Sequence, residues 1–328
     1  MKRTISVAPM MDCTDRHDRF FLRLISKNVM LYSEMVATKS AIHGDRKKIL
    51  TFSPEEKPLA LQVGGSDKKE LSEVAKIAQD MDYDEININL GCPSKKVQKN
   101  KFGACLMKEP NLVSECINEM INSCNIPVTA KTRIGFDDIE DFDYLNKFIL
   151  KIKEAGCKTF ILHARKAILK GLTPKQNLNI PKLNYEMVYK IKKENPDLEI
   201  IINGGISKIE EIKNHLRICN GVMIGRVIYQ NPYFLVDIEK EIFNVKKLPT
   251  REEVAEKLLK YLEKEVKLGT GVNKIMRHTV GLYHGQIGSK NWKRYLSDNM
   301  MARESDFQKA KYIMTIVQNN EKINQTIT

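Results

Sequence analysis

The sequence lacks any run of about 18 apolar residues, the minimum for a helix that crosses a membrane. Its first residues, Met1–Thr4, carry no apolar core of the kind that signal peptides have. The seven cysteines are widely spaced and odd in number, and no Cys-x-x-Cys pair is among them, so neither a disulfide framework nor a zinc site is expected. These absences favour a cytoplasmic protein that works without a membrane or a bound metal.

A Gly-x-Gly-x-x-Gly turn is also missing after the first strand-like segment, which argues against a dinucleotide-binding open sheet. Instead, eight strand-like segments alternate with helical patterns. This alternation predicts an α/β protein built on a (β/α)8 TIM barrel, with a doubly wound open sheet as the second choice. The segments are Ile5–Pro9, Val29–Glu34, Leu59–Val63, Ile86–Pro93, Pro127–Lys131, Thr159–His163, Glu199–Asn203 and Gly221–Ile224.

Apolar residues recur at helical spacing between these segments. Helices are predicted over Lys68–Met81, Asn111–Ser123, Phe142–Glu154 and Tyr185–Lys193, and over a stretch with Ile209, Ile212 and Leu216. Ser66 or Asp67 is expected to cap the first of these, and Ser207 the last. Gly156 is expected to end the helix over Phe142–Glu154.

No strand-like segment follows Pro249, and helices are predicted over Arg251–Leu268, Lys274–Tyr283, Trp292–Met300 and Ser305–Gln318. The sequence therefore predicts two domains, a catalytic barrel over residues 1–244 and an all-helical domain over residues 245–328.

The formal net charge is +13, and residues 245–328 contain 16 Lys and Arg against 9 Asp and Glu, a net charge of +7. Such an excess favours an anionic partner, such as nucleic acid or a phosphorylated cofactor. A lysine-rich surface that serves solubility explains the composition equally well, so charge alone does not identify the partner.

In a (β/α)8 barrel, catalytic groups lie where the strands end at their C-terminal face. The predicted ends carry many polar groups: Glu34, Gln62, Asn89, Lys131 with Arg133, His163 with Arg165, Asn203 and Arg226. Glycines in Asn203-Gly204-Gly205 and in Gly225-Arg226, followed by helix starts, are typical of a phosphate site.

A phosphorylated cofactor is therefore predicted. Lys131 can stabilise negative charge on a reduced flavin, and Gln62 can both donate to and accept from the pyrimidine edge of that ring, which favours flavin mononucleotide (FMN). Pyridoxal phosphate, bound to Lys131 as a Schiff base, is the alternative.

Cys92 follows a strand in which Ile86 and Ile88 alternate with Asn87 and Asn89, and it precedes a lysine-rich loop with Lys95, Lys96, Lys99 and Lys101. A lone cysteine is more often a small buried apolar residue than a reactive one. The residue alone therefore leaves both interpretations open.

Several motifs together resemble the tRNA-dihydrouridine synthases over essentially the whole chain. They are Ser6–Asp15, Leu61–Gly65, Asn87–Pro93 followed by Phe102-Gly103-Ala104, Lys131–Gly135, His163-Ala164-Arg165 and Asn203–Ile206. Asp15-Arg16-His17, His163–Ala167, Gly171–Lys175 and Trp292–Ser297 are similar to the A subfamily, which reduces uridines at about positions 20 and 20a of the tRNA D-loop.

The resemblance implies a barrel that binds FMN, reduction of the flavin by NADPH, and a helical domain that holds tRNA. It places the flavin at Pro9, Met10, Met11, Gln62, Lys131, His163, Asn203, Gly204, Gly205, Gly225 and Arg226. It makes Cys92 the catalytic acid and puts tRNA contacts at Asn89, Lys175, Lys293, Arg294 and Ser297. A monomer is expected. Leu178 stands where the subfamily often has a basic residue, and Ile168 where it often has an aromatic one.

The implied mechanism transfers a hydride from reduced flavin to uracil C6 and a proton from Cys92 to C5. Because cations lower the pKa of a thiol, the loop lysines are expected to point outward and the thiol to lie among apolar groups. Alternatives are another dihydrouridine synthase subfamily, a flavin barrel acting on a free pyrimidine, and a catalytically silent RNA-binding protein.

Overall fold

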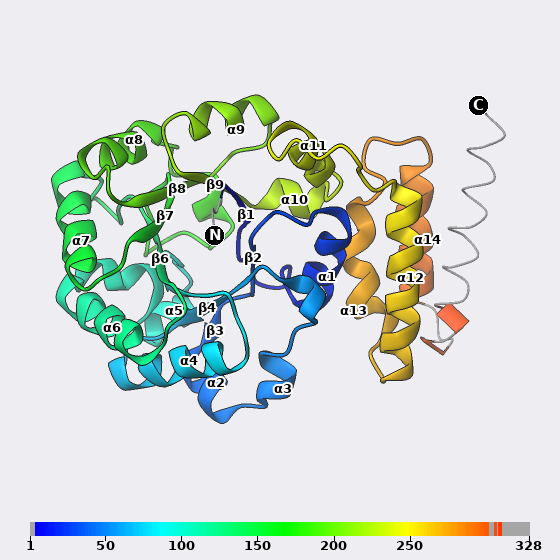
Figure 1. Ribbon diagram of the computed structural model, residues 1–328, viewed down its shortest axis with the longest axis horizontal. Helices are drawn as coiled ribbons and strands as arrows, with labels where there is room; N and C mark the ends of the chain where they lie inside the picture. The colour runs from blue at the N-terminus through cyan, green and yellow to red at the C-terminus, as the bar shows by residue number, and fades with distance from the viewer. Residues whose placement is uncertain (1–3, 302–304, 307, 310–328) are drawn as a thin grey trace. The chain divides into compact units, whose positions relative to one another are not determined.

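The computed structural model describes residues 4–301, 305–306 and 308–309, and they fall into two compact units (Figure 1). The first unit contains the chain up to Thr14 and then Val29–Gly225. The second contains Asp15–Asn28 and the chain from Arg226 onward. The chain therefore passes between the units three times.

The first unit is a nearly closed parallel barrel, as the sequence predicted. Its strands are β1 (Ile5–Val7), β2 (Leu31–Tyr32), β3 (Val36–Ala37), β4 (Leu59–Gly64), β5 (Glu85–Leu90), β6 (Val128–Arg133), β7 (Thr159–His163), β8 (Glu199–Asn203) and β9 (Gly221–Ile224). Their order is β1-β9-β8-β7-β6-β5-β4-β2, with β3 also beside β4. Main-chain hydrogen bonds of Met30 with Ile5 and Val7 join the two ends of this sheet. Each of the eight predicted segments contains a strand, and only β3 was not foreseen.

Alternation along each strand separates two environments. On β5, Ile86, Ile88 and Leu90 are fully buried under the surrounding helices, while the residues between them turn into the barrel. Part of the interior is an apolar cluster of Ala8, Met30, Tyr32, Ala60, Ile161, Ile201 and Met223.

The outer ring is formed by α4 (Lys68–Asp80), α6 (Pro110–Ser123), α7 (Phe142–Glu154), α8 (Tyr185–Glu194) and α9 (Ile209–Leu216) (Figure 1). Asp67 caps α4, since its carboxylate accepts from the N–H groups of Lys69 and Glu70. Gly156, with a φ of +103°, follows the end of α7 as predicted.

One predicted cap was wrong. The helix α9 begins at Ile209, and Ser207 does not cap it. Instead, the carboxylate of Glu211 accepts hydrogen bonds from the N–H groups of Ser207 (2.8 Å) and Lys208 (3.1 Å). The Glu211 side chain therefore satisfies the two amides just before α9, at the place where the sequence pattern predicted a serine cap.

The second unit is helical. It contains α12 (Arg251–Lys267), α13 (Val272–Met276), a 3-10 helix (Arg277–Gly281) and α14 (Ser289–Met301), which match three of the predicted helices. The fourth, Ser305–Gln318, lies mostly outside the described residues. The unit also contains α1 (Arg16–Ile25), α10 (Arg226–Gln230) and α11 (Phe234–Glu241), which the sequence patterns did not reveal.

Helix α1 is tied to α12 within this unit. Arg16 pairs with Glu265 at 2.7 Å, and Phe20 stacks on Tyr261 with ring centroids 3.8 Å apart. The Nδ1 atom of His17 lies 2.7 Å from the hydroxyl of Tyr261, and burial lowers the pKa of His17 to about 4, so this imidazole is neutral at physiological pH.

Six shorter helices lie in the described part of the first unit: α2 (Thr38–His43), α3 (Arg46–Ile49), α5 (Lys95–Lys99) and 3-10 helices at Pro54–Glu56, Gly103–Lys108 and Gln176–Leu178. Within the described residues, no helix combines the length and apolar character needed to cross a bilayer.

The interior of the barrel should tolerate truncation poorly. Ile161 is completely buried in the apolar cluster, so Ile161→Ala leaves a cavity and should lower the free energy of unfolding by about 2–5 kcal/mol. Ile180, which is 58% exposed in the same unit, provides the control, and Ile180→Ala should change that free energy by less than about 0.5 kcal/mol. Urea unfolding followed by circular dichroism measures both, and equal effects would contradict the assigned core.

Candidate active site at the mouth of the barrel

The register of the strands places the predicted site residues near the C-terminal ends of neighbouring strands. Gln62 on β4 is paired with Asn87 on β5, and Asn89 with Lys131 on β6. On the next two strands of the barrel, His163 of β7 is paired with Asn203 of β8. Because all these strands run parallel, their C-terminal ends surround one mouth, as a catalytic (β/α)8 barrel requires.

Cys92 lies in a turn directly after β5. The side-chain oxygen of Asn89 accepts from the N–H groups of Gly91 (3.1 Å) and Cys92 (2.9 Å). On the other side, the Ala104 N–H donates to the Cys92 carbonyl at 2.9 Å. Gly103 has a φ of +76°, and a Cβ there would lie 2.6 Å from the same carbonyl oxygen, so only glycine lets the chain approach this closely.

The environment of Cys92 keeps its thiol protonated. Burial raises the pKa of Cys92 above the ordinary value of 9.0, against the opposing influence of a backbone hydrogen bond from Ser94 and the charges of Arg133 and Lys131. The four loop lysines are exposed, as expected. The cations that act on the thiol are thus those at the end of β6, and they do not outweigh its desolvation.

Cys92 forms part of the wall of a pocket of about 640 Å³ within the first unit. Apolar side chains line one part of it, and a hydrogen bond of 2.6 Å from Thr38 to the carboxylate of Glu70 lies in another. The remaining lining residues are Met11, Met35, Ala37, Lys39, Ser40, Gly64, Ser66, Asp67, Ser94, Lys96, Val97, Asn100 and Phe102.

Lys131 is a partly buried cation at the mouth. Its ammonium donates to the side-chain oxygen of Asn203 at 3.0 Å, and Asn203 in turn donates to the Met223 carbonyl at 2.8 Å. Burial, followed by the nearby charge of Arg133, lowers the pKa of Lys131 to about 7. In the part of the chain that the structure describes, Lys131 forms no salt bridge with a carboxylate, so an anionic ligand would stabilise its charged form.

Gly204 and Gly205 follow β8 with φ of +118° and +72°, a conformation that side chains rarely adopt. A Cβ on Gly204 would lie 2.6 Å from the imidazole Cδ2 of His163. The missing side chains let His163 and Leu183 pack against this turn, and its main-chain N–H groups are the candidates to bind the phosphate of a cofactor. Glu211 already accepts from the N–H groups of Ser207 and Lys208, which lie between the glycine turn and α9.

Arg133 organises the loops around the mouth, a role that the sequence did not reveal. Its guanidinium donates to the carbonyls of Gly91 (3.0 Å), Lys166 (2.9 Å) and Asn177 (3.2 Å). Burial lowers the pKa of Arg133 to about 10, so it remains charged at neutral pH. It thereby links the turn of Cys92 to the segment that follows β7.

The other predicted residues fall into two groups. Pro9, Met10 and Met11 follow β1, Gly225 follows β9, and exposed Lys175 precedes a short 3-10 helix at Gln176–Leu178, all in the first unit. Arg226, the first residue of α10, and exposed Lys293, Arg294 and Ser297 on α14 belong to the second unit. No group of three or more His, Cys, Asp or Glu is arranged to hold a metal ion among the described residues.

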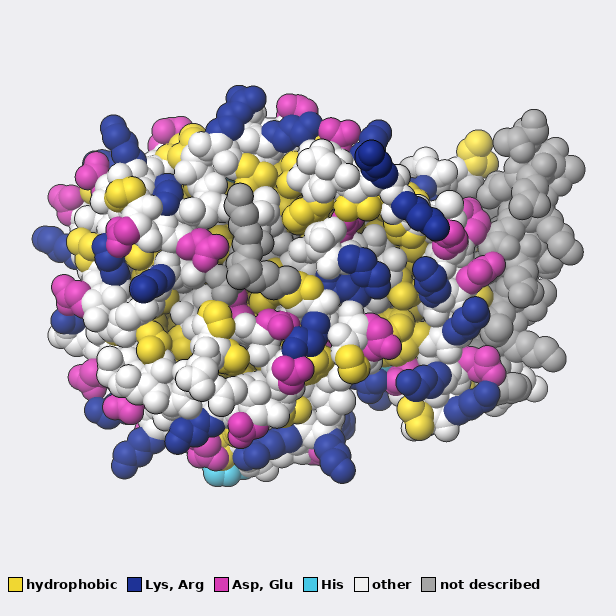
Figure 2. Space-filling model, viewed as in Figure 1, with side chains coloured by type: hydrophobic (Ala, Val, Ile, Leu, Met, Phe, Trp, Pro, Cys, Tyr) yellow, Lys and Arg dark blue, Asp and Glu magenta, His cyan; other side chains and the backbone are white. Residues whose placement is uncertain are grey.

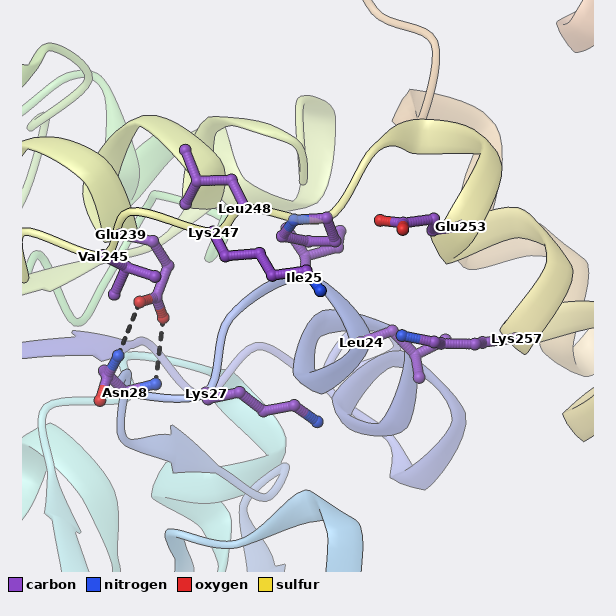
Figure 3. Close-up of a pocket in the computed structure, with 11 residues that line it drawn as sticks. Leu24, Ile25, Lys27, Asn28, Glu239, Val245, Lys247, Leu248, Glu253 and Lys257 are labelled. Atoms are coloured by element: carbon purple, nitrogen blue, oxygen red, sulfur yellow. Dashed lines mark hydrogen bonds between the residues drawn. The ribbon is translucent and has the colours of Figure 1, made fainter.

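A smaller pocket of about 290 Å³ lies within the second unit, beside Leu24, Lys247 and Lys257 (Figure 3). Its most deeply buried carboxylate, Glu239, is held by the main-chain N–H of Asn28 (3.0 Å) and the side-chain amide of Asn28 (2.6 Å). None of the residues predicted from the sequence to act in catalysis or binding lines this pocket.

Surface charge does not mark a partner site on the face in view. Figure 2 shows Lys and Arg side chains spread over this face, with Asp and Glu interspersed among them.

The chain is similar to proteins of known name. The sequence profile of the family described as dihydrouridine synthase (Dus) matches residues 6–320. A tRNA-dihydrouridine(20/20a) synthase of Synechocystis sp. is 48% identical over 298 residues, which cover 90% of this chain and 89% of that protein. Proteins of the same name from Shewanella oneidensis (49% over 300 residues, 91% and 89% coverage) and Escherichia coli strain K12 (46% over 314 residues, 95% and 91%) are equally similar.

The protonation state of Cys92 can be measured directly. Its rate of alkylation by iodoacetamide should rise with pH and reach half its maximum above pH 9.0, because only the thiolate reacts and burial disfavours it. Mass spectrometry of the peptide that contains Cys92 follows the reaction. A midpoint below pH 7 would mean that Cys92 is mostly a thiolate at neutral pH, contrary to its assignment as an acid.

Proposed function

Since the chain belongs to the dihydrouridine synthase family, we propose that it is a flavin-dependent oxidoreductase that reduces uridine to 5,6-dihydrouridine in tRNA. The relatives named for positions 20 and 20a support these D-loop uridines as its substrate. The observation that carries the proposal is the pairing of Asn89 on β5 with Lys131 on β6. Cys92, whose thiol has a raised pKa, follows Asn89 by three residues, and among the described residues Lys131 pairs with no carboxylate.

The barrel mouth fits FMN. Lys131 and Gln62 would hold the pyrimidine end of the ring, with His163, Asn203 and the segment Pro9–Met11 around it. Gly204, Gly205, Gly225 and Arg226 would bind the phosphate. When bound and reduced by NADPH, the flavin supplies the hydride that saturates the uracil C5=C6 bond.

Cys92 completes the reaction. Its neutral thiol gives a proton to C5 of the base, and the charges of Arg133 and Lys131 then stabilise the thiolate that remains. The base must leave its stack to reach this thiol, which costs least for a D-loop uridine that is already partly unstacked. The pocket beside Cys92 provides space for it.

The helical domain of residues 245–328 is proposed to hold the tRNA backbone. Lys293 and Arg294 are exposed on α14 and can contact phosphates, and Ser297 lies one turn further on the same helix. From the barrel, Lys175 and Asn89 are proposed to contact the nucleotide chain near the target base. Neither contact needs to read the sequence of the RNA, since the position of the uridine follows from the shape of the tRNA.

The proposed function predicts a defined loss in cells. Removal of the gene should abolish dihydrouridine at positions 20 and 20a of tRNA, and the purified protein with FMN and NADPH should restore it. Reverse-transcription mapping after borohydride treatment locates the modified positions. Loss at other positions would indicate a different subfamily, and turnover of free uridine would indicate a small-molecule enzyme.

Replacement of the proposed acid should separate the two halves of the reaction. Cys92→Ala should slow dihydrouridine formation by about 10²–10⁴-fold, the usual contribution of a general acid, while NADPH still reduces the flavin. Cys105→Ala is the control, because Cys105 is also partly buried, its thiol donates to the Phe102 carbonyl at 3.1 Å, and no role in the reaction is proposed for it. Stopped-flow absorbance and tRNA digestion measure the two steps, and unchanged product formation by Cys92→Ala would refute the assignment.

The salt dependence of binding tests the role of α14. Each of Lys293→Ala and Arg294→Ala should weaken tRNA binding and lower the slope of log K against log salt by about 1, because one phosphate contact is lost. Lys76→Ala, which removes an exposed lysine from α4 on the outside of the barrel, should leave the slope unchanged. Point variants suit this test better than truncation after Pro249, which would uncover the face of α1 that packs on α12.

A further inference from the structure

A continuous chain of side-chain hydrogen bonds runs through the interior of the barrel to the turn of Cys92. It consists of Glu85, Thr129, Asn87, Gln62 and Asn89, and is called the amide relay below. The Thr129 hydroxyl donates to Glu85, Asn87 donates to Thr129 (2.8 Å), Gln62 to Asn87 (2.8 Å), and Asn89 to Gln62 (2.9 Å). The oxygen of Asn89 then accepts from the main chain of Gly91 and Cys92.

The relay is shielded from water. Glu85, Asn87 and Thr129 are completely buried, Gln62 is 1% exposed, and Asn89, nearest the mouth, is 9% exposed. Water therefore cannot replace a lost partner, and each buried amide depends on its neighbours in the relay to satisfy its donors and acceptors.

The two ends of the relay impose one direction on it. At the inner end, Glu85 also accepts from the hydroxyl of Tyr32 at 2.8 Å, so its carboxylate acts as an acceptor. At the outer end, the main-chain N–H groups of Gly91 and Cys92 can only donate. The three amides between these ends must all point their nitrogens inward and their oxygens outward, because turning any one of them would oppose donor to donor and acceptor to acceptor.

This direction matters for the proposed reaction at two places. It turns the oxygen of Asn89 toward the turn that carries the Cys92 thiol. It also fixes the orientation of the Gln62 amide, whose nitrogen donates to Asn87 and whose oxygen accepts from Asn89. The acid and the residue proposed to face the flavin are thus aligned by the same hydrogen bonds. Thr129 is the link that joins them to Glu85, because its single hydroxyl hydrogen points to the carboxylate and its oxygen faces Asn87.

We propose that Thr129, together with Glu85, is a positioning residue for Cys92: it fixes the direction of the amide relay and thereby holds the thiol in place for proton transfer. The proposal rests on the proposed function for its effect on dihydrouridine formation. Its effect on the thiol itself can be measured without tRNA.

Thr129→Val keeps the shape of the side chain and removes the hydroxyl. The amide of Asn87 then loses its acceptor, and the relay is no longer held in one direction. Formation of dihydrouridine from the reduced enzyme should fall by about 10–100-fold, because a misplaced acid is costly even when the altered residue is remote. Alkylation of Cys92 at fixed pH should change by about threefold or more relative to that of Cys105 in the same molecule.

Two variants on the same strand serve as controls. Thr129→Ser keeps a hydroxyl and should restore both rates to those of the unaltered protein. Thr132→Val removes an equally buried hydroxyl that makes only long contacts, to the Leu90 carbonyl at 3.4 Å and the Arg133 carbonyl at 3.3 Å, and should leave both rates unchanged.

The outcomes are distinct. If Thr129→Val lowers only the melting temperature, and both rates measured well below that temperature equal those of Thr132→Val, the relay is merely structural and the proposal is wrong. If the unaltered protein forms no dihydrouridine, the proposed function fails, while the alkylation rates still decide whether the relay positions the thiol. Should Thr129→Val not fold, Asn87→Ser interrupts the relay at its next link, and the same loss in both rates is expected of it.

Discussion

The arrangement of the mouth depends on which face of each parallel strand turns into the barrel. On β5 and β6 the inward positions hold Asn87, Asn89, Thr129 and Lys131, and the outward ones hold aliphatic side chains and Thr132, which pack under helices. A shift of one residue in either strand would exchange these two sets completely. The hydrophobic outer face therefore fixes the register, and the register alone determines that an amide from one strand meets a cation from the next.

Polar groups inside a barrel are tolerated only when they form hydrogen bonds. Here the neutral groups and the cations differ in the partners they have. The amides and hydroxyls satisfy one another along β4, β5 and β6, whereas Lys131 and Arg133 contact amide and carbonyl oxygens. Among the residues that the structure describes, these neutral partners leave the positive charges of Lys131 and Arg133 uncompensated where they are partly desolvated. The same surroundings disfavour a thiolate at Cys92, so one environment provides both an attraction for anions and a protonated thiol.

The sequence predicted the barrel well, because strands such as Glu199–Asn203 and helices such as α7 carry strong periodic patterns. It also located the ends of the strands, and so most residues of the mouth. It could not show that Glu211 occupies the amides before α9, or that Arg133 holds three carbonyls from two loops, since these contacts depend on how the loops fold over the barrel. Helix α1 was missed because its apolar face is short, and its partners lie about 240 residues away in the chain.

That separation also orders events during synthesis. Arg16 and Glu265 are 249 residues apart, so at 5–20 residues per second the ribosome delivers the partner of α1 about 12–50 s after α1 itself. Throughout this interval the barrel segments are synthesised, while α1, a charged and amphipathic helix, still lacks α12, the helix on which it packs. The helical unit is therefore not a separate domain added after the barrel, because α1, which lies between two barrel strands in the sequence, is part of it. Its completion is the last step by which the earliest helix of the nascent chain finds its place.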